Sequence, residues 1–98
     1  MAIIRWTDEA YNWLQDIFQY IANDNPDAAH RVVSEIYKNA QLLSKYPQSG
    51  SRYRKEPEGD VRILLFGHYR IAYLHNVDDT IDILGVFHGA LDIEKYLP

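Results

Sequence analysis

The chain has 98 residues, which is enough for one domain with a single core and favours a site on an open surface over a deep enclosed pocket. It carries 10 lysines and arginines against 14 aspartates and glutamates, and the net charge of −4 argues against stable nucleic-acid binding through phosphates. The lack of cysteine excludes disulfides and thiolate metal sites. No apolar stretch approaches the ~20 residues of a membrane span, and no signal-peptide pattern opens the chain, so a cytoplasmic protein without membrane contact is expected.

A short strand followed by a helix is predicted at the start of the chain. The apolar run over residues 2–6 is brief enough for an edge strand. Thr7 is a suitable N-cap because its hydroxyl can accept a backbone N–H of the first turn, and two acidic residues follow it where the helix dipole favours anions. A helix over residues 8–23 is predicted from an apolar stripe with spacings of four, three and four: Ala10, Leu14, Ile17 and Ile21.

A second helix is predicted directly after the first. Asn25 can cap it and Pro26 suits its first position, while the same pair ends the helix before it. Its apolar stripe ends before Pro47 and contains Ala29, Val32, Val33, Ile36, Tyr37, Ala40 and Leu43. Because so few residues separate the helices, they must form an antiparallel hairpin whose joined apolar faces can cover a sheet.

The segment 47–60 is predicted to be a surface loop of about fourteen residues, because it combines two prolines and two glycines with no apolar periodicity. It holds the single basic cluster of the sequence, Arg52 to Lys55, which acidic residues follow at once. The cluster is interpreted either as a solvated segment or as a phosphate contact with Tyr53 stacked on a base.

Residues 61–88 are predicted to form a three-stranded antiparallel meander, since three apolar runs alternate with period two between turn-like breaks at Gly67 and at residues 76–79. Each run is expected to place one set on one face: Val61, Ile63 and Leu65; Tyr69, Ile71 and Tyr73; Ile81, Ile83 and Phe87. With the N-terminal strand, this predicts an α/β (α+β) domain over residues 1–98. Its order is β-α-α-β-β-β, with the helical hairpin on a mainly antiparallel four-stranded sheet and a short C-terminal helix or tail.

The opposite sheet face is expected to be partly occluded and to hold Arg62, Arg70 and His88, which makes it the candidate site. Plainer interpretations remain open. Arg62 can pair with Glu58 or Asp60, Arg70 can stack or pair within the fold, and His88 can simply end its strand. The four histidines are scattered, so neither a metal site nor a cofactor is expected.

The order and spacing of several short motifs resemble the ParE/RelE superfamily of bacterial type II toxins, which includes plasmid stabilisation proteins, over essentially the whole chain. Each motif alone is weak, and their shared order carries the resemblance. The motifs are W-T-x-x-A at 6–10, Y-I at 20–21, N-P-x-A-A at 25–29, Y-P-x-S-G at 46–50, V-R at 61–62, Y-R-I-x-Y at 69–73 and V-F-H-G-A-x-D at 86–92.

The resemblance implies a toxin neutralised by an antitoxin encoded beside it, and it leaves two mechanisms open. ParE-like members poison DNA gyrase by protein–protein binding, whereas RelE-like members cut messenger RNA on the ribosome. The nuclease candidates are Arg62, Arg70, His88 and Tyr96, a thin supply of cations for a crowded phosphate. Leu91 stands where nuclease relatives often have arginine. A ParE-like gyrase inhibitor is therefore favoured, with a nuclease or an inactive member that only binds antitoxin and represses its operon as alternatives.

By the same resemblance, the antitoxin is expected to dock over the helix hairpin and to occlude Trp13 and Phe18, with an added strand at the sheet edge as a further contact. No residue is assigned a catalytic role under the favoured mechanism. The predicted partner-binding residues are Trp13, Phe18, Tyr20, Arg52, Arg54, Arg62, Tyr69, Arg70 and His88.

Overall fold

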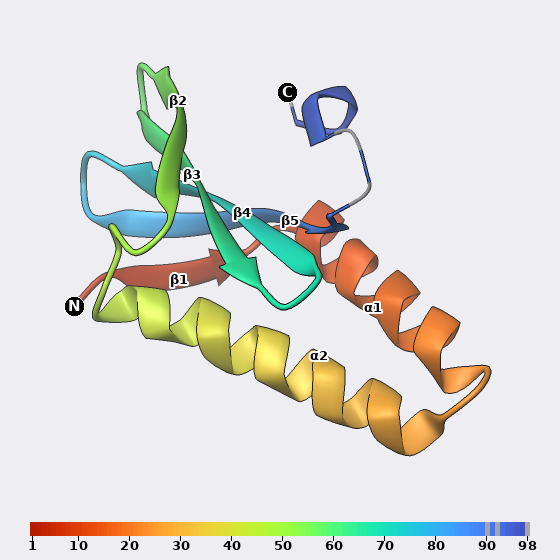
Figure 1. Ribbon diagram of the computed structural model, residues 1–98. Helices are drawn as coiled ribbons and strands as arrows, with labels where there is room; N and C mark the ends of the chain where they lie inside the picture. The colour runs from red at the N-terminus through yellow and green to blue at the C-terminus, as the bar shows by residue number, and fades with distance from the viewer. Residues whose placement is uncertain (90, 92, 98) are drawn as a thin grey trace.

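The computed structural model describes residues 1–89, 91 and 93–97, and it places a helical hairpin against one face of a sheet (Figure 1). The termini of the elements agree closely with their sequence signals except between residues 47 and 60. In chain order the elements are β1 (Ile3–Trp6), α1 (Asp8–Ala22), α2 (Pro26–Gln41), a 3-10 helix (Leu42–Ser44), β2 (Ser51–Glu56), β3 (Gly59–Phe66), β4 (Tyr69–Asn76), β5 (Thr80–His88) and a second 3-10 helix (Ile93–Lys95).

Both helix starts are capped by side chains as predicted. The Thr7 hydroxyl accepts the backbone N–H of Ala10 at 3.1 Å, and the Asn25 side-chain oxygen accepts that of Ala28 at 3.1 Å. Each cap satisfies one of the N–H groups that the first turn leaves without an intrahelical partner. No helix among the described residues is both long and apolar enough to cross a membrane.

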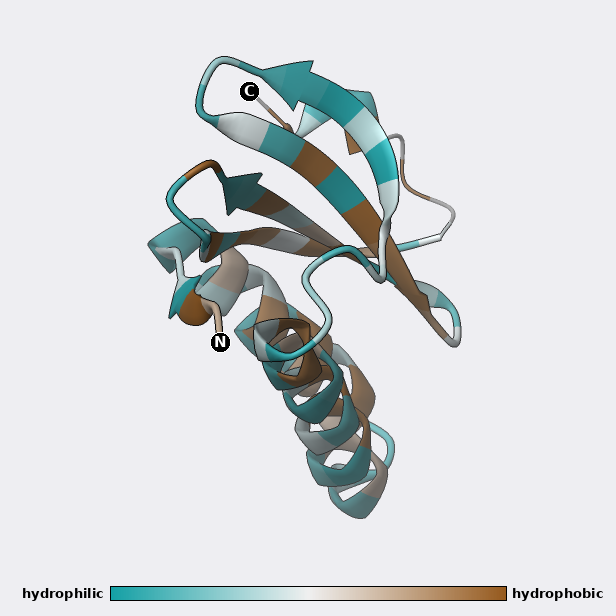
Figure 2. Cartoon of the chain, turned by 90° about the vertical axis from the view of Figure 1, so that its left-hand side faces the viewer, coloured by the Kyte–Doolittle hydropathy of each residue, from teal (hydrophilic) through white to brown (hydrophobic). Residues whose placement is uncertain are grey.

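The sheet has five strands in the order β1-β5-β4-β3-β2, with β1 parallel to β5 and the other pairs antiparallel. The predicted four-stranded sheet and the predicted loop over residues 47–60 are wrong, because residues 51–56 form β2. Figure 2 shows β2 almost entirely in the hydrophilic colour, beside an alternating β3. Backbone pairing with β3, in which Arg52 lies opposite Arg62, makes this edge strand without any apolar pattern.

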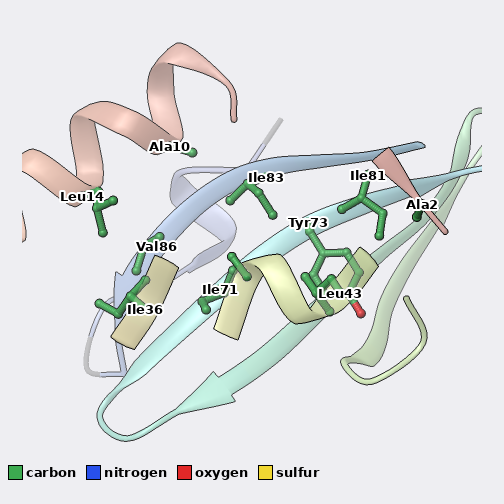
Figure 3. Packing of buried hydrophobic residues seen from close by; sticks show 11 residues of the cluster. Ala2, Ala10, Leu14, Ile36, Leu43, Ile71, Tyr73, Ile81, Ile83 and Val86 are labelled. Atoms are coloured by element: carbon green, nitrogen blue, oxygen red, sulfur yellow. The ribbon is translucent and has the colours of Figure 1, made fainter. Parts of the chain in front are cut away.

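The helices cover one sheet face and form the main core. There the fully buried Tyr73 and Ile71 of β4 lie in one cluster with Ile36 of α2 and Leu43 of the 3-10 helix that follows it (Figure 3). The opposite face holds a second cluster that the C-terminal segment covers. Its buried members are Val61, Ala72, Phe87, Ile93 and Leu97. Partial occlusion of this face was expected from its mixed apolar and polar residues.

The predicted face assignment is wrong for part of the meander. Val61 and Ile63 lie in the second cluster, because the register sets Ile63 opposite Ala72 rather than beside Ile71. In β5 the register shifts by one residue, since Ala72 pairs with Gly85 but Tyr73 pairs with Ile83. The extra residue reverses the alternation, so Phe87 faces the second cluster whereas Ile81 and Ile83 face the helices.

Candidate functional site

Four of the nine predicted partner-binding side chains, those of Trp13, Tyr20, Tyr69 and His88, line a cleft of about 510 Å³ between α1 and the ends of β4 and β5. One wall is a face of α1, whose lining residues follow Trp13 at helical spacings of three, four and seven. The other wall comes from the start of β4, the end of β5 and the segment that follows it. The lining residues are Trp13, Asp16, Ile17, Tyr20, Tyr69, Val86, His88 and Leu91.

Trp13 is held in place at one end of this cleft by two aromatic neighbours. Its ring meets the edge of Phe87 with centroids 4.8 Å apart and that of Tyr96 at 5.1 Å. Phe87 and Tyr96 also stack on one another at 5.9 Å. Tyr96 therefore sits in an aromatic cluster between α1 and β5, where ring packing accounts for its position.

Tyr20 and Tyr69 lie near one another on the two walls. The pKa of Tyr69 is raised above its ordinary value, first by burial and then by the nearby Tyr20. Tyr20 is 80% exposed, so its ring is presented to solvent beside a partly buried ring. His88 stands against the edge of Tyr69 with centroids 5.8 Å apart and stacks on His68 at 6.3 Å.

Phe18 belongs to a separate groove between the two helices. Its ring meets that of His30 from α2 with centroids 4.9 Å apart. The groove has a volume of about 440 Å³ and is lined in part by Tyr11, Leu14 and Val33. Phe18 and Trp13 thus contribute to two different hollows on α1 rather than to one patch.

Arg62 and Arg70 lie on opposite faces of the sheet, and each donates to the backbone of a connecting segment. The Arg62 Nη1 donates to the Gly50 carbonyl at 2.6 Å, and Arg62 pairs across β3 and β4 with Tyr73 of the helix-covered face. Arg70 Nη2 donates to the Leu91 carbonyl at 2.6 Å and faces the second cluster. The expectation that one sheet face holds both arginines is wrong, because the register gives them opposite parity.

The basic cluster at residues 52–55 lies on the edge strand β2, which β3 and β4 separate from β5. Arg52 forms an ion pair with Asp60 at 3.5 Å and Arg54 with Glu56. Arg62 also approaches Asp60, at 3.9 Å, as its plainer interpretation predicted. These neighbouring acids offset the positive charge locally, and neither Arg52 nor Arg54 lines the aromatic cleft.

Within the described part of the chain, no three histidine, aspartate or glutamate side chains are placed to hold a metal ion together. His75 instead contacts Asp79, with Nε2 and Oδ1 2.8 Å apart. The motif at residues 86–92 includes Ala90 and Asp92, which lie outside the described residues.

Sequence reasoning missed four residues of the cleft, Asp16, Ile17, Val86 and Leu91. The first two were accessible in principle, because positions 13, 16, 17 and 20 share one helical face. Val86 and Leu91 were not, since the register shift in β5 decides which side of the sheet they approach. The anchoring role of Tyr73 was also missed; its hydroxyl accepts the Gly50 N–H at 2.9 Å and donates to the Pro47 carbonyl at 2.8 Å.

Two solved structures share the fold of this chain, and both belong to toxin–antitoxin systems. The chromosomal ParDE system of P. aeruginosa gives a TM-score of 0.72 at 23% identity, covering 90% of this chain and 96% of that one. The RelBE2 toxin–antitoxin complex of Mycobacterium tuberculosis gives 0.66 at 26% identity, covering 89% and 96%.

The sequence comparisons identify the family. The model of the ParE toxin of the type II toxin–antitoxin system parDE matches residues 4–93. Y4kP of Sinorhizobium fredii, which is named as a candidate toxin, is 38% identical over 86 residues, covering 88% of this chain and 86% of the relative. The chain belongs to the ParE toxin family of type II toxin–antitoxin systems.

Proposed function

We propose that this toxin inhibits DNA gyrase by protein–protein binding and that a cognate antitoxin neutralises it. The observation that carries the proposal is that Arg62 and Arg70 form hydrogen bonds within the fold. Both donate to backbone carbonyls, at 2.6 Å each, from opposite faces of the sheet. A nuclease needs cations that converge on one phosphate, and these two side chains are committed to holding the chain instead. The net charge of −4 also supports a protein target over RNA, because a negatively charged protein repels phosphates.

The antitoxin is expected to dock on the helix hairpin and to cover Trp13 and Phe18. These rings lie at two hollows of about 510 Å³ and 440 Å³ on the same helix, which can receive successive side chains of an amphipathic segment. β2 is an edge strand of the sheet, the position at which a partner can add a strand. A complex in which both half-buried rings keep the exposure that they have in the free toxin would contradict this placement.

A supercoiling assay with purified toxin tests the target. Added to gyrase and relaxed plasmid, the toxin is expected to stop supercoiling and to leave cleaved DNA complexes, and preincubation with the adjacent-gene antitoxin is expected to restore activity. In a parallel assay, the toxin is added to translating ribosomes, and the messenger RNA is expected to stay uncut. Codon-positioned cuts together with unaffected supercoiling would refute the gyrase assignment.

One observation favours the nuclease alternative enough to test it. His88 is exposed and shares a hollow with His68 and Arg70 beside the aromatic cleft, so an imidazole and a guanidinium do lie near one another. A His88→Ala variant should keep its fold, because the side chain is on the surface. Full toxicity of this variant supports gyrase binding, whereas loss of toxicity together with loss of messenger RNA cleavage supports catalysis.

A further inference from the structure

The aromatic cleft has the composition of a site for a cation. Three of its eight lining residues are aromatic, and they come from both walls: Trp13 and Tyr20 from α1, and Tyr69 from β4. The faces of such rings carry the negative part of the aromatic quadrupole, which attracts ammonium and guanidinium groups within ~6 Å of the ring centre. Asp16 stands one turn from both α1 rings and adds a carboxylate.

No described lysine or arginine forms an ion pair with Asp16. The surface around the cleft on α1 is also negatively charged. Residues 7–30, which include all of α1, contain no lysine or arginine, and their acidic residues are Asp8, Glu9, Asp16, Asp24 and Asp27. A cationic partner therefore meets a carboxylate in the cleft and a negative field along the helix that forms one of its walls.

The cleft also has apolar surface, and this limits the kind of molecule that can carry the cation. Ile17 and Leu91 line the cleft with partly exposed apolar side chains, and the fully buried Val86 lies beneath them. A small inorganic ion would gain nothing from these groups, whereas the long methylene stem of an arginine or lysine side chain would pack on them. The chemistry thus points to a basic side chain on a protein segment.

We propose that the cleft binds an arginine or lysine side chain of the cognate antitoxin, held between the rings of Trp13, Tyr20 and Tyr69 and paired with Asp16. This inference rests on the toxin–antitoxin pairing proposed above. It adds that the antitoxin segment seated here is basic and carries an apolar residue next to the cation, because charge complementarity with the acidic helix selects it.

Affinity measurements on the full-length toxin with the protein encoded by the adjacent gene test the proposal. Asp16→Asn and Tyr20→Leu are expected to weaken binding roughly threefold to tenfold each, because one removes the carboxylate and the other the ring face. Tyr20→Phe keeps the ring and should bind like the unaltered toxin. Glu58→Gln and Tyr46→Leu are the matched controls, an exposed acid and an exposed tyrosine outside both the cleft and the acidic stretch 7–30.

The salt dependence separates a cation site from a merely apolar one. The unaltered toxin should lose affinity as sodium chloride rises from about 50 to 500 mM, and Asp16→Asn should lose clearly less. Circular dichroism of each variant verifies its fold; Tyr20 is 80% exposed, so its replacement should leave the fold intact.

If the unaltered toxin binds the adjacent-gene protein but Asp16→Asn and Tyr20→Leu behave like the two controls, the cation site is wrong and the toxin–antitoxin pairing stands. If the unaltered toxin does not bind that protein at all, both proposals fall. Equal affinities of Tyr20→Leu and Tyr20→Phe would also overturn the site, because they would show that the aromatic face contributes nothing.

Discussion

Single polar side chains in this protein stabilise connecting segments that have no regular structure. The Tyr73 ring is fully buried under the helices, and its hydroxyl both accepts from Gly50 and donates to Pro47. Gly50 is required at its position, because a Cβ there would come within 2.8 Å of the Ile63 carbonyl oxygen. The Y-P-x-S-G motif is thus explained by the backbone contacts of its proline and glycine.

Tyr73→Phe should lower the free energy of unfolding by about 1–3 kcal/mol, because the buried Gly50 N–H and the Pro47 carbonyl both lose their partner. Urea denaturation measures the change. Tyr46→Phe is the matched control, since that side chain is exposed, and should change stability by less than about 0.5 kcal/mol. Equal effects of the two substitutions would contradict the anchoring role of Tyr73.

Tyr73 and Tyr69 together predict how stability changes at alkaline pH. Burial raises the pKa of Tyr69 and of Tyr73 in the folded chain above the ordinary value of about 10. The unfolded chain therefore loses these protons first, so stability is complete below pH ~10 and falls as the pH rises above it. Thermal melts between pH 8 and 11 should show this loss, and Tyr69→Phe should make it shallower. A Tyr69→Phe profile identical to that of the parent would refute the assignment.

At the scale of elements, the C-terminal segment closes the sheet face that the helices leave open. Ile93 and Leu97 are buried against Val61, Ala72 and Phe87. A guanidinium holds the start of this segment, because Arg70 donates to the Leu91 carbonyl. The sheet is consequently covered on both faces although the chain is short.

Arg70→Ala should release the C-terminal segment without unfolding the sheet. The lost charged hydrogen bond costs about 1.5–3 kcal/mol locally, so amide hydrogen exchange at residues 93–97 should accelerate while β4 and β5 stay protected. Arg31→Ala, at an exposed position on α2, is the control. Unchanged exchange at residues 93–97 in Arg70→Ala would show that apolar packing alone holds the segment.

At the scale of the whole molecule, the hairpin extends well beyond the sheet and the chain measures 41 × 29 × 22 Å (Figure 1). The hairpin includes the acidic α1, while Arg52 and Arg54 lie on the edge strand β2 and form ion pairs with Asp60 and Glu56. Positive charge is therefore dispersed over the surface rather than concentrated in one groove.

This distribution predicts that the isolated toxin does not bind nucleic acid stably. Fluorescence anisotropy with single-stranded RNA of about 20 nucleotides should give a dissociation constant weaker than ~100 μM at 150 mM salt, because few phosphates can be neutralised at once. A dissociation constant in the low micromolar range that weakens steeply with salt would contradict this expectation and favour the nuclease alternative.

Much of the fold was predictable from local signals. The caps at Thr7 and Asn25, the helical stripes and the order of the three meander strands were predicted correctly, because each depends on a few neighbouring residues. β2 escaped prediction since its charged sequence has no period and only pairing with β3 makes it a strand. For the site, four predicted residues, Trp13, Tyr20, Tyr69 and His88, do meet in one cleft, whereas Arg52 and Arg54 lie elsewhere.

The sequence by itself determined the family, the order of the main elements and the acidic character of α1, because these follow from residue identity and spacing along the chain. Only the tertiary structure decided the roles of Arg62 and Arg70, which the sequence presents as equivalent strand arginines. Strand register places them on opposite faces, and each then meets a carbonyl from a distant segment. A one-residue change in pairing exchanges the two faces of a strand, and no local pattern records that choice.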